Sequence, residues 1–220
     1  SPAYIERVAR AFNGDTTGVR GDMQAVIRAI LTDPEALADP DPNGQFGKLR
    51  EPVVRNVAML RQLGATSNDG FIFNSGYVVQ FLAKQHALSA PSVFNFFLPS
   101  HSPPGELAAA GLVAPEFQIT TSSSIAGVTN LVDWLLVIGA VTDAPEPFSP
   151  VSLDLDEYRA LVNNVDDFID RLDIVFTAGT LSMDSRQAIA GTLEPMDDME
   201  LRLLMGLYLI LVSPDYAVRL

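Results

Sequence analysis

Apolar side chains recur every three to four residues along most of this chain, a pattern typical of amphipathic helices. Between residues 21 and 31 the apolar positions fall at i, i+3, i+4, i+7 and i+8. An equally regular stripe runs through residues 165–176 and stops before Gly179. The pattern predicts these helical stretches: 1–13, 21–31, 48–63, 106–112, 115–138 with a break near 122–124, one from 154, 165–176, one from 182, and 197–212.

Residues that favour helix ends support several of these boundaries. Ser1 is suited to cap a helix with Pro2 in its first position, and Asn13-Gly14 is suited to end it. Asp154 followed three residues later by Glu157 resembles a capping box, and Ser182 precedes another apolar stretch. The sequence therefore predicts separate helices joined by loops.

Residues 65–88 allow two interpretations. Two short apolar runs, 71–73 and 77–79, flank Asn74-Ser75-Gly76, which is compatible with a small hairpin over residues 71–79. The alternative is an irregular loop that leads into a helix over residues 77–84.

These elements predict an all-α fold, a multi-helix bundle of about eight to ten helices with long loops rich in proline and glycine. We expect residues 1–220 to form a single helical unit packed around the last helix and the 165–176 stripe. Residues 144–150 contain three prolines and mark the best candidate for an internal seam.

Composition excludes several classes of function. The chain has no cysteine, which removes disulfides, thiolate metal sites and cysteine nucleophiles. Residues 1–63 carry eight acidic and eight basic residues, so residues 64–220 hold 27 − 8 = 19 acidic and 14 − 8 = 6 basic residues. Because such a surface repels phosphate backbones, we expect no nucleic-acid partner.

The chain also offers no predicted membrane segment or signal peptide. Its longest apolar run, residues 203–212, is about half of the roughly 20 residues that a spanning helix needs. The chain begins at a helix cap without an apolar leader, and we expect it to be the C-terminal portion of a longer chain.

One group of charged residues is a candidate pocket. Arg50, Glu51 and Arg55 lie close together at the start of the predicted 48–63 helix. Arg50 or Arg55 has the geometry to bind a carboxylate through two hydrogen bonds, with Glu116 as a candidate partner. Such a pair would lock two helices together, and the alternative is a pocket for an anion or a substrate carboxylate. His101 completes the candidate set.

The sequence lacks the residue patterns of several other kinds of catalytic and ligand-binding site. His86 and His101 are the only histidines, and they lack the spacing of a zinc site. The sequence has no Gly-x-Ser-x-Gly motif and no glycine-rich phosphate loop, so it predicts no cofactor and no metal. Phe94, Phe96 and Phe97 are better suited to core packing than to a sugar-binding platform, which favours tryptophan and tyrosine.

Seven segments follow one another along the chain: YIERVARAFN (4–13), GVRGDMQAVIRAILTDP (18–34), GKLREP (47–52), APSVFNFF (90–97), SPPG (102–105), GLVAPEFQI (111–119) and SPDY (213–216). In this order they resemble the C-terminal part of the bacterial family known as domain of unknown function 1800. The match departs from the family pattern at His101 and across residues 65–88.

The resemblance implies a mostly helical fold, a full-length chain about twice as long, and export to the bacterial envelope or exterior. It also implies genetic pairing with a second exported family, domain of unknown function 1501. It supplies no established activity, cofactor or catalytic residue.

Two functional hypotheses follow. The first is a non-catalytic structural or interaction domain of an exported bacterial protein, which supports an N-terminal half or docks an envelope partner through residues 65–105. The second is part of an exported hydrolase acting on envelope or extracellular polymer. Its site would lie at the junction with the N-terminal half, with Arg50, Glu51, His101 and Glu116 meeting in one pocket.

Overall fold

The computed structural model describes residues 1–15, 17–38, 47–72, 76–136 and 149–219. These residues group into two compact units, residues 1–46 and 47–220. The sequence predicts a single unit over residues 1–220, with residues 144–150 as the candidate for an internal seam. That seam falls mostly on residues outside the described part and stays a prediction.

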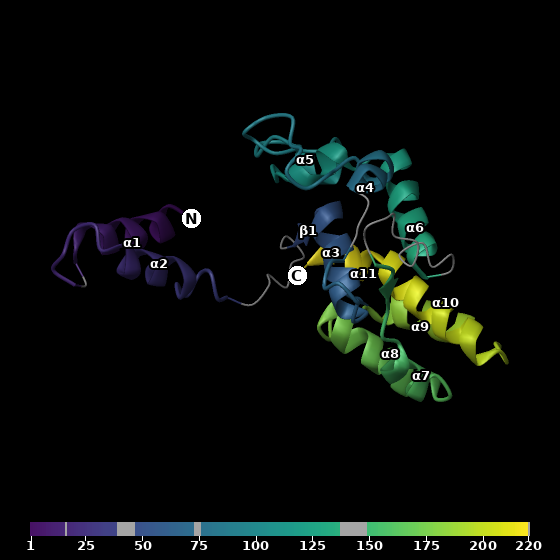
Figure 1. The fold of residues 1–220 in the computed structure, drawn as a ribbon. Helices are drawn as coiled ribbons and strands as arrows, with labels where there is room; N and C mark the ends of the chain where they lie inside the picture. Colours follow the sequence, from purple (N-terminus) through teal and green to yellow (C-terminus); the bar gives the residue numbers. More distant parts are fainter. Residues whose placement is uncertain (16, 39–46, 73–75, 137–148, 220) are drawn as a thin grey trace. The chain divides into compact units, whose positions relative to one another are not determined.

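The described residues are mainly helical, which confirms the predicted all-α fold (Figure 1). They hold eleven α-helices rather than eight to ten: α4 corresponds to the helical alternative for residues 77–84, and α11, only four residues long, lies outside the predicted stretches. The α-helices are α1 (Pro2–Asn13), α2 (Met23–Leu31), α3 (Pro52–Gln62), α4 (Gly76–Ala83), α5 (Glu106–Ala109), α6 (Ser122–Leu136), α7 (Asp156–Leu161), α8 (Val165–Leu172), α9 (Met183–Leu193), α10 (Met199–Val212) and α11 (Pro214–Ala217). A 3₁₀-helix, η1 (Pro115–Ile119), precedes α6, and a π-helical turn, η2 (Asp173–Thr177), extends α8.

The first unit is a pair of helices, α1 and α2, held by a buried carboxylate. Asp33 accepts two hydrogen bonds from Arg7, at 2.6 and 2.7 Å, and the Tyr4 hydroxyl donates to the Ile30 carbonyl at 2.6 Å. Asp22 caps α2 by accepting from the Ala25 N–H. Apolar side chains on both helices stay exposed within this unit, including Ile5 at 71%.

In the second unit the core forms around α10, as the sequence predicts. Four of its side chains, Leu203, Leu207, Ile210 and Leu211, are fully buried. They pack in one cluster with the predicted 165–176 stripe, which supplies Phe168, Ile169, Leu172 and Phe176. Helix α10 touches α6, α7, α8, α9 and α11, so it is the central element of this unit.

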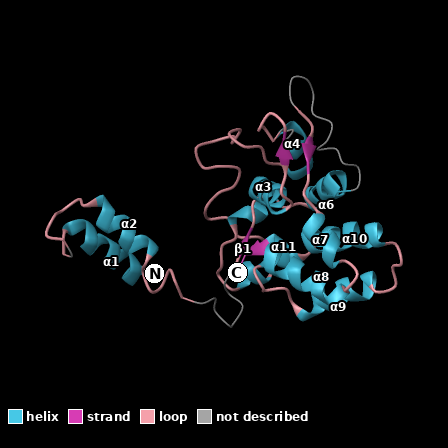
Figure 2. Cartoon of the chain, turned by 60° about the horizontal axis from the view of Figure 1, so that its bottom comes forward, coloured by secondary structure: helices cyan, strands magenta, loops and turns pink. Residues whose placement is uncertain are grey.

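The predicted start of the 48–63 helix is wrong by four residues. Lys48–Leu49 form a strand, β1, and α3 begins at Pro52. A residue before proline is pushed away from helical geometry, and Glu51 is accordingly extended, with φ −57° and ψ 139°. Strand β1 pairs antiparallel with β4 (Val218–Arg219), and β2 (Thr66–Ser67) pairs antiparallel with β3 (Val151–Ser152) (Figure 2).

For residues 71–79 the helical alternative is confirmed. Gly76–Ala83 form α4, which packs against α6, so the second strand of the suggested hairpin is helical. Residues 73–75, which would have formed its turn, lie outside the described residues. None of the helices described here combines the length and apolarity needed to cross a bilayer.

Asp69 links the loops beside the β2–β3 sheet and should titrate at unusually low pH. Its carboxylate accepts hydrogen bonds from the Ser149 N–H at 2.7 Å, the Phe71 N–H at 2.9 Å and the Ser67 hydroxyl at 2.8 Å. These bonds, chiefly the backbone donors, lower the pKa of Asp69 from 3.8 to about 2. The contribution to stability is therefore complete above the unfolded pKa and is lost as the pH falls through about 2.

A carboxyl ¹³C NMR titration between pH 6 and pH 1.5 measures this pKa directly. The Asp69→Asn variant should lose the corresponding part of the dependence of unfolding free energy on pH. An Asp69 midpoint near 4 would show that the three hydrogen bonds do not form in solution.

Candidate functional site

Segments far apart in the sequence meet around residues 48–51, a region that we call the 48–51 junction. Lys48 forms an ion pair with Glu116 of η1, with 3.2 Å between Nζ and Oε1. Glu51 Oε2 accepts hydrogen bonds from Gln85 Nε2 at 2.6 Å and from Asn95 Nδ2 at 3.3 Å. The junction thus connects the start of α3 to the loops after α4 and before α6.

The local sequence explains why these side chains face the same place. Pro52 fixes the start of α3 and keeps Glu51 extended, so residues 48–51 approach α3 as a strand rather than a helical turn. That strand is held by β4 and by the Arg50 N–H, which donates to the Ala217 carbonyl at 2.8 Å.

Gln85 is the buried centre of the Glu51 contacts. It is 1% exposed, and its Oε1 accepts from the Val53 N–H at 3.0 Å, one of the N–H groups that a helix start leaves without an internal partner. Its side-chain amide therefore accepts a hydrogen bond from the first turn of α3 and donates one to the Glu51 carboxylate. Sequence analysis did not identify Gln85 or Asn95, because neither lies close to Glu51 along the chain.

Tyr216, which is fully buried, organises the other side of the junction. The guanidinium carbons of Arg50 and Arg55 lie 4.7 and 5.3 Å from the centre of its ring. Its hydroxyl lies 2.9 Å from Gln62 Oε1 and 3.3 Å from the Arg55 carbonyl. Burial raises the pKa of Tyr216 to about 12, so the phenol stays neutral at physiological pH.

The segment SPDY owes its place in the fold to hydrogen bonds at two helix starts. Ser213 caps α11 by accepting from the Tyr216 N–H at 3.1 Å. Asp215 accepts from the N–H and the hydroxyl of Ser182, at 3.1 and 3.2 Å, and from the Ser185 hydroxyl, all at the start of α9. Tyr216 is thereby held in the core.

Arg55 is the most buried cation of the junction. Its Nη2 donates to the Leu211 carbonyl, while its Nε is buried without a hydrogen-bond partner among the described residues. Burial, followed by the nearby positive charge of Arg50, lowers the pKa of Arg55 to about 10. Arg55 still carries a full charge at neutral pH.

Glu116 does not pair with Arg50 or Arg55, the partners suggested from the sequence. The carboxylate pairs with Lys48, and both arginines are placed against Tyr216 instead. The stacking follows from the β1–β4 pairing, which brings residues 50 and 216 together. Tyr216 was missed from sequence, although its segment is among those that carry the family resemblance.

The five candidate residues do not form a single pocket. Arg50 and Arg55 line a pocket of about 370 Å³, whose described lining includes neither Glu51, His101 nor Glu116. His101 lies in the loop before α5, where its N–H donates to the Leu98 carbonyl at 3.0 Å and its carbonyl accepts from the Ala114 N–H at 2.9 Å. Within the described ranges, no three histidine, aspartate or glutamate side chains gather as metal ligands would.

The arrangement suits binding and bracing better than proton transfer. Glu51 and Glu116 are engaged with an amide pair and an ammonium group, respectively, and two cations face a pocket. Of the four residues that the hydrolase hypothesis invokes, this pocket's described lining includes Arg50 only, and a site at a junction with an N-terminal half stays a prediction.

Comparison with known proteins gives one match. The family model described as "Protein of unknown function (DUF1800)" matches residues 1–218. No curated protein and no solved structure matches the chain. Four of the segments listed from sequence, those at 47–52, 90–97, 111–119 and 213–216, contribute side chains to the 48–51 junction. The chain therefore belongs to the DUF1800 family of proteins of unknown function.

Proposed function

We propose that this chain is a non-catalytic interaction domain of an exported bacterial protein, and that it docks the N-terminal half of its own full-length chain. The supporting observation is a set of exposed apolar side chains concentrated between residues 81 and 98. We call it the 81–98 apolar segment; it comprises Phe81, Leu88, Val93, Phe94 and Leu98.

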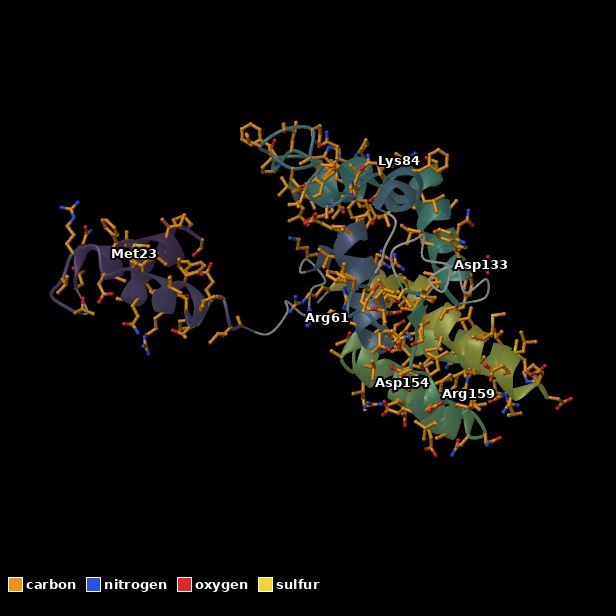
Figure 3. All side chains as sticks on the ribbon, viewed as in Figure 1. Met23, Arg61, Lys84, Asp133, Asp154 and Arg159 are labelled. Carbon is orange, nitrogen blue, oxygen red and sulfur yellow. The ribbon has the colours of Figure 1, made fainter. Side chains whose placement is uncertain are left out.

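The large apolar side chains of this segment are more exposed than their residue types would suggest. Phe94 is 61% exposed, although its sequence suggested core packing, and Leu88 and Val93 are almost fully exposed. Single exposed apolar residues are common on protein surfaces, whereas contiguous apolar patches mark sites of interaction, and we take the five exposed residues of this segment as such a patch. The segment begins on α4, where Lys84 (labelled in Figure 3) lies over the Phe81 ring at 5.6 Å.

The junction supports the non-catalytic part of the proposal. Asn95 ties the apolar segment to Glu51, and Gln85 ties the end of α4 to the same carboxylate. These bonds brace the exposed side chains on the rigid start of α3, which suits a docking surface.

A photo-crosslinking amino acid at position 81 or 94 of the full-length protein tests this function. We expect crosslinks to the N-terminal half, because an exposed phenylalanine that docks there lies against it. The matched control places the same amino acid at Met183, an exposed apolar position on α9, and should give no such crosslink.

Equal crosslinking from all three positions, or none from positions 81 and 94, would contradict the docking. Crosslinks to a separate protein of the domain of unknown function 1501 family would instead identify that protein as the partner. The non-catalytic part fails if the full-length protein has a turnover that Glu51→Gln or Glu116→Gln abolishes while leaving the unfolding free energy unchanged. Export is tested by finding the full-length protein in the envelope or external fraction of its host.

A further inference from the structure

A pocket of about 370 Å³ opens beside the 48–51 junction, within the second unit. Its walls come from the start of α3, from η1 and α6, and from the turn that joins α10 to α11 and β4. Its volume lies within the range of about 300–1,000 Å³ that is typical of small-molecule sites.

Two positive charges line this pocket, and its described lining contains no carboxylate. Neither Arg50 nor Arg55 has an acidic side chain within salt-bridge distance among the described residues. The guanidinium carbons of both arginines lie over the ring of the same residue, Tyr216, at 4.7 and 5.3 Å from the ring centre. Neighbouring like charges with little access to water repel each other, and a bound anion would relieve that repulsion.

Arg55 has an unused hydrogen-bond donor at this place. Its Nη2 is bonded to the Leu211 carbonyl, whereas its buried Nε–H has no partner among the described residues. Buried donors without partners are rare in folded proteins, so each one calls for an explanation. An anionic group in the pocket would both balance the charge and bring acceptor oxygens to the guanidinium groups.

The remaining walls are mainly apolar. Ser124 and Ser213, two of the hydroxyl residues in the lining, already donate to main-chain carbonyls at 2.8 and 2.7 Å. The apolar side chains that line the pocket are Leu49, Pro52, Phe117, Ile125, Val128, Val212, Pro214, Ala217 and Val218. A small hydrated anion would leave most of this surface without a partner.

We propose that the pocket binds a small amphipathic anion, with an alkyl chain against the apolar walls and a carboxylate or phosphate head group at Arg50 and Arg55. The planar guanidinium group matches both head groups through paired hydrogen bonds. This site is separate from the 81–98 apolar segment, and it does not depend on the proposed docking.

Isothermal titration calorimetry of the 220-residue chain with octanoate and with octyl phosphate tests the site. We expect saturable binding of at least one of them with a stoichiometry of one. Acetate and inorganic phosphate lack the chain and octanol lacks the charge, so each of these three should bind at least tenfold more weakly. The stronger of the two amphipathic probes identifies the head group.

Variants then locate the binding. Arg50→Gln should weaken binding about tenfold or more, since it removes a charge-assisted hydrogen bond. Ile125→Asp should also weaken it, because it places a negative charge on the lining at a position exposed enough to leave the fold intact. The matched control is Arg61→Gln (labelled in Figure 3), which changes an exposed arginine of α3 that is outside this lining.

The proposal is overturned if neither octanoate nor octyl phosphate binds at millimolar concentration. It is also overturned if octanol binds as tightly as the anions, or if Arg61→Gln weakens binding as much as Arg50→Gln. Circular dichroism of each variant establishes that a loss of binding is not a loss of fold.

Discussion

Tyr216→Ala should lower the free energy of unfolding by about 3–5 kcal/mol, the range observed when a buried aromatic side chain is cut back to alanine. Tyr216 is fully buried and contacts Phe176 edge-on, with 5.9 Å between ring centres. The substitution would remove that contact, leave a cavity beside Arg50 and Arg55, and free both guanidinium groups from the ring face. Urea unfolding followed by circular dichroism measures the loss.

Tyr216→Phe separates the hydroxyl from the ring. It keeps the packing and removes only the contacts with Gln62 and the Arg55 carbonyl, so it should cost about 1 kcal/mol. A Tyr216→Ala loss no larger than that of Tyr216→Phe would mean that the ring does not organise the junction.

Gly127→Ala is expected to destabilise the second unit by about 1–3 kcal/mol, as overpacking of a tight interface does. A Cβ at position 127 would lie 2.0 Å from the Leu82 carbonyl oxygen and 2.6 Å from its carbon. These are main-chain atoms of α4, so they cannot move aside as a flexible side chain would. Helices α4 and α6 would have to separate, and Ala83 and Val79 of α4 would lose part of their packing.

Gly191→Ala on α9 is the matched control. Nothing lies within 4 Å of the Cβ that it would add, and alanine favours a helix interior by about 1 kcal/mol relative to glycine. The two variants should therefore shift the urea midpoint in opposite directions. A neutral Gly127→Ala would show that α4 and α6 are not in close contact in solution.

Local signals in the sequence were sufficient for most of the helices. Ser1 and Ser182 cap the helices that follow them, as the sequence predicts, whereas the predicted capping box at Asp154 is not found, since α7 has Leu155 at its N-cap and no side-chain cap. The 165–176 stripe also identified the core correctly. What the spacing of apolar residues determines is which face of a helix is apolar, and not what covers that face. Ile5 belongs to the apolar side of α1, but it is 71% exposed within its unit.

The candidate site was harder to predict, because its contacts join distant residues. The sequence placed Arg50, Glu51, Arg55 and Glu116 in one neighbourhood, but the partners of the first three, Gln85, Asn95 and Tyr216, lie from 85 − 51 = 34 to 216 − 50 = 166 positions away. No spacing rule connects such positions. The π-helical turn at Asp173–Thr177 was equally invisible, because its side chains continue the apolar stripe of α8.

The pairing of β1 with β4 also constrains the order in which parts of this protein fold. Lys48 is matched to Arg219 and Leu49 to Val218, so the first strand of the second unit has no partner until residues 218 and 219 have been made. Tyr216 reaches Arg55 at the same late stage. Contacts that close such long stretches of chain slow folding. A chain that stops before residue 218 would therefore leave β1 unpaired and expose the start of α3 to chaperones and proteases.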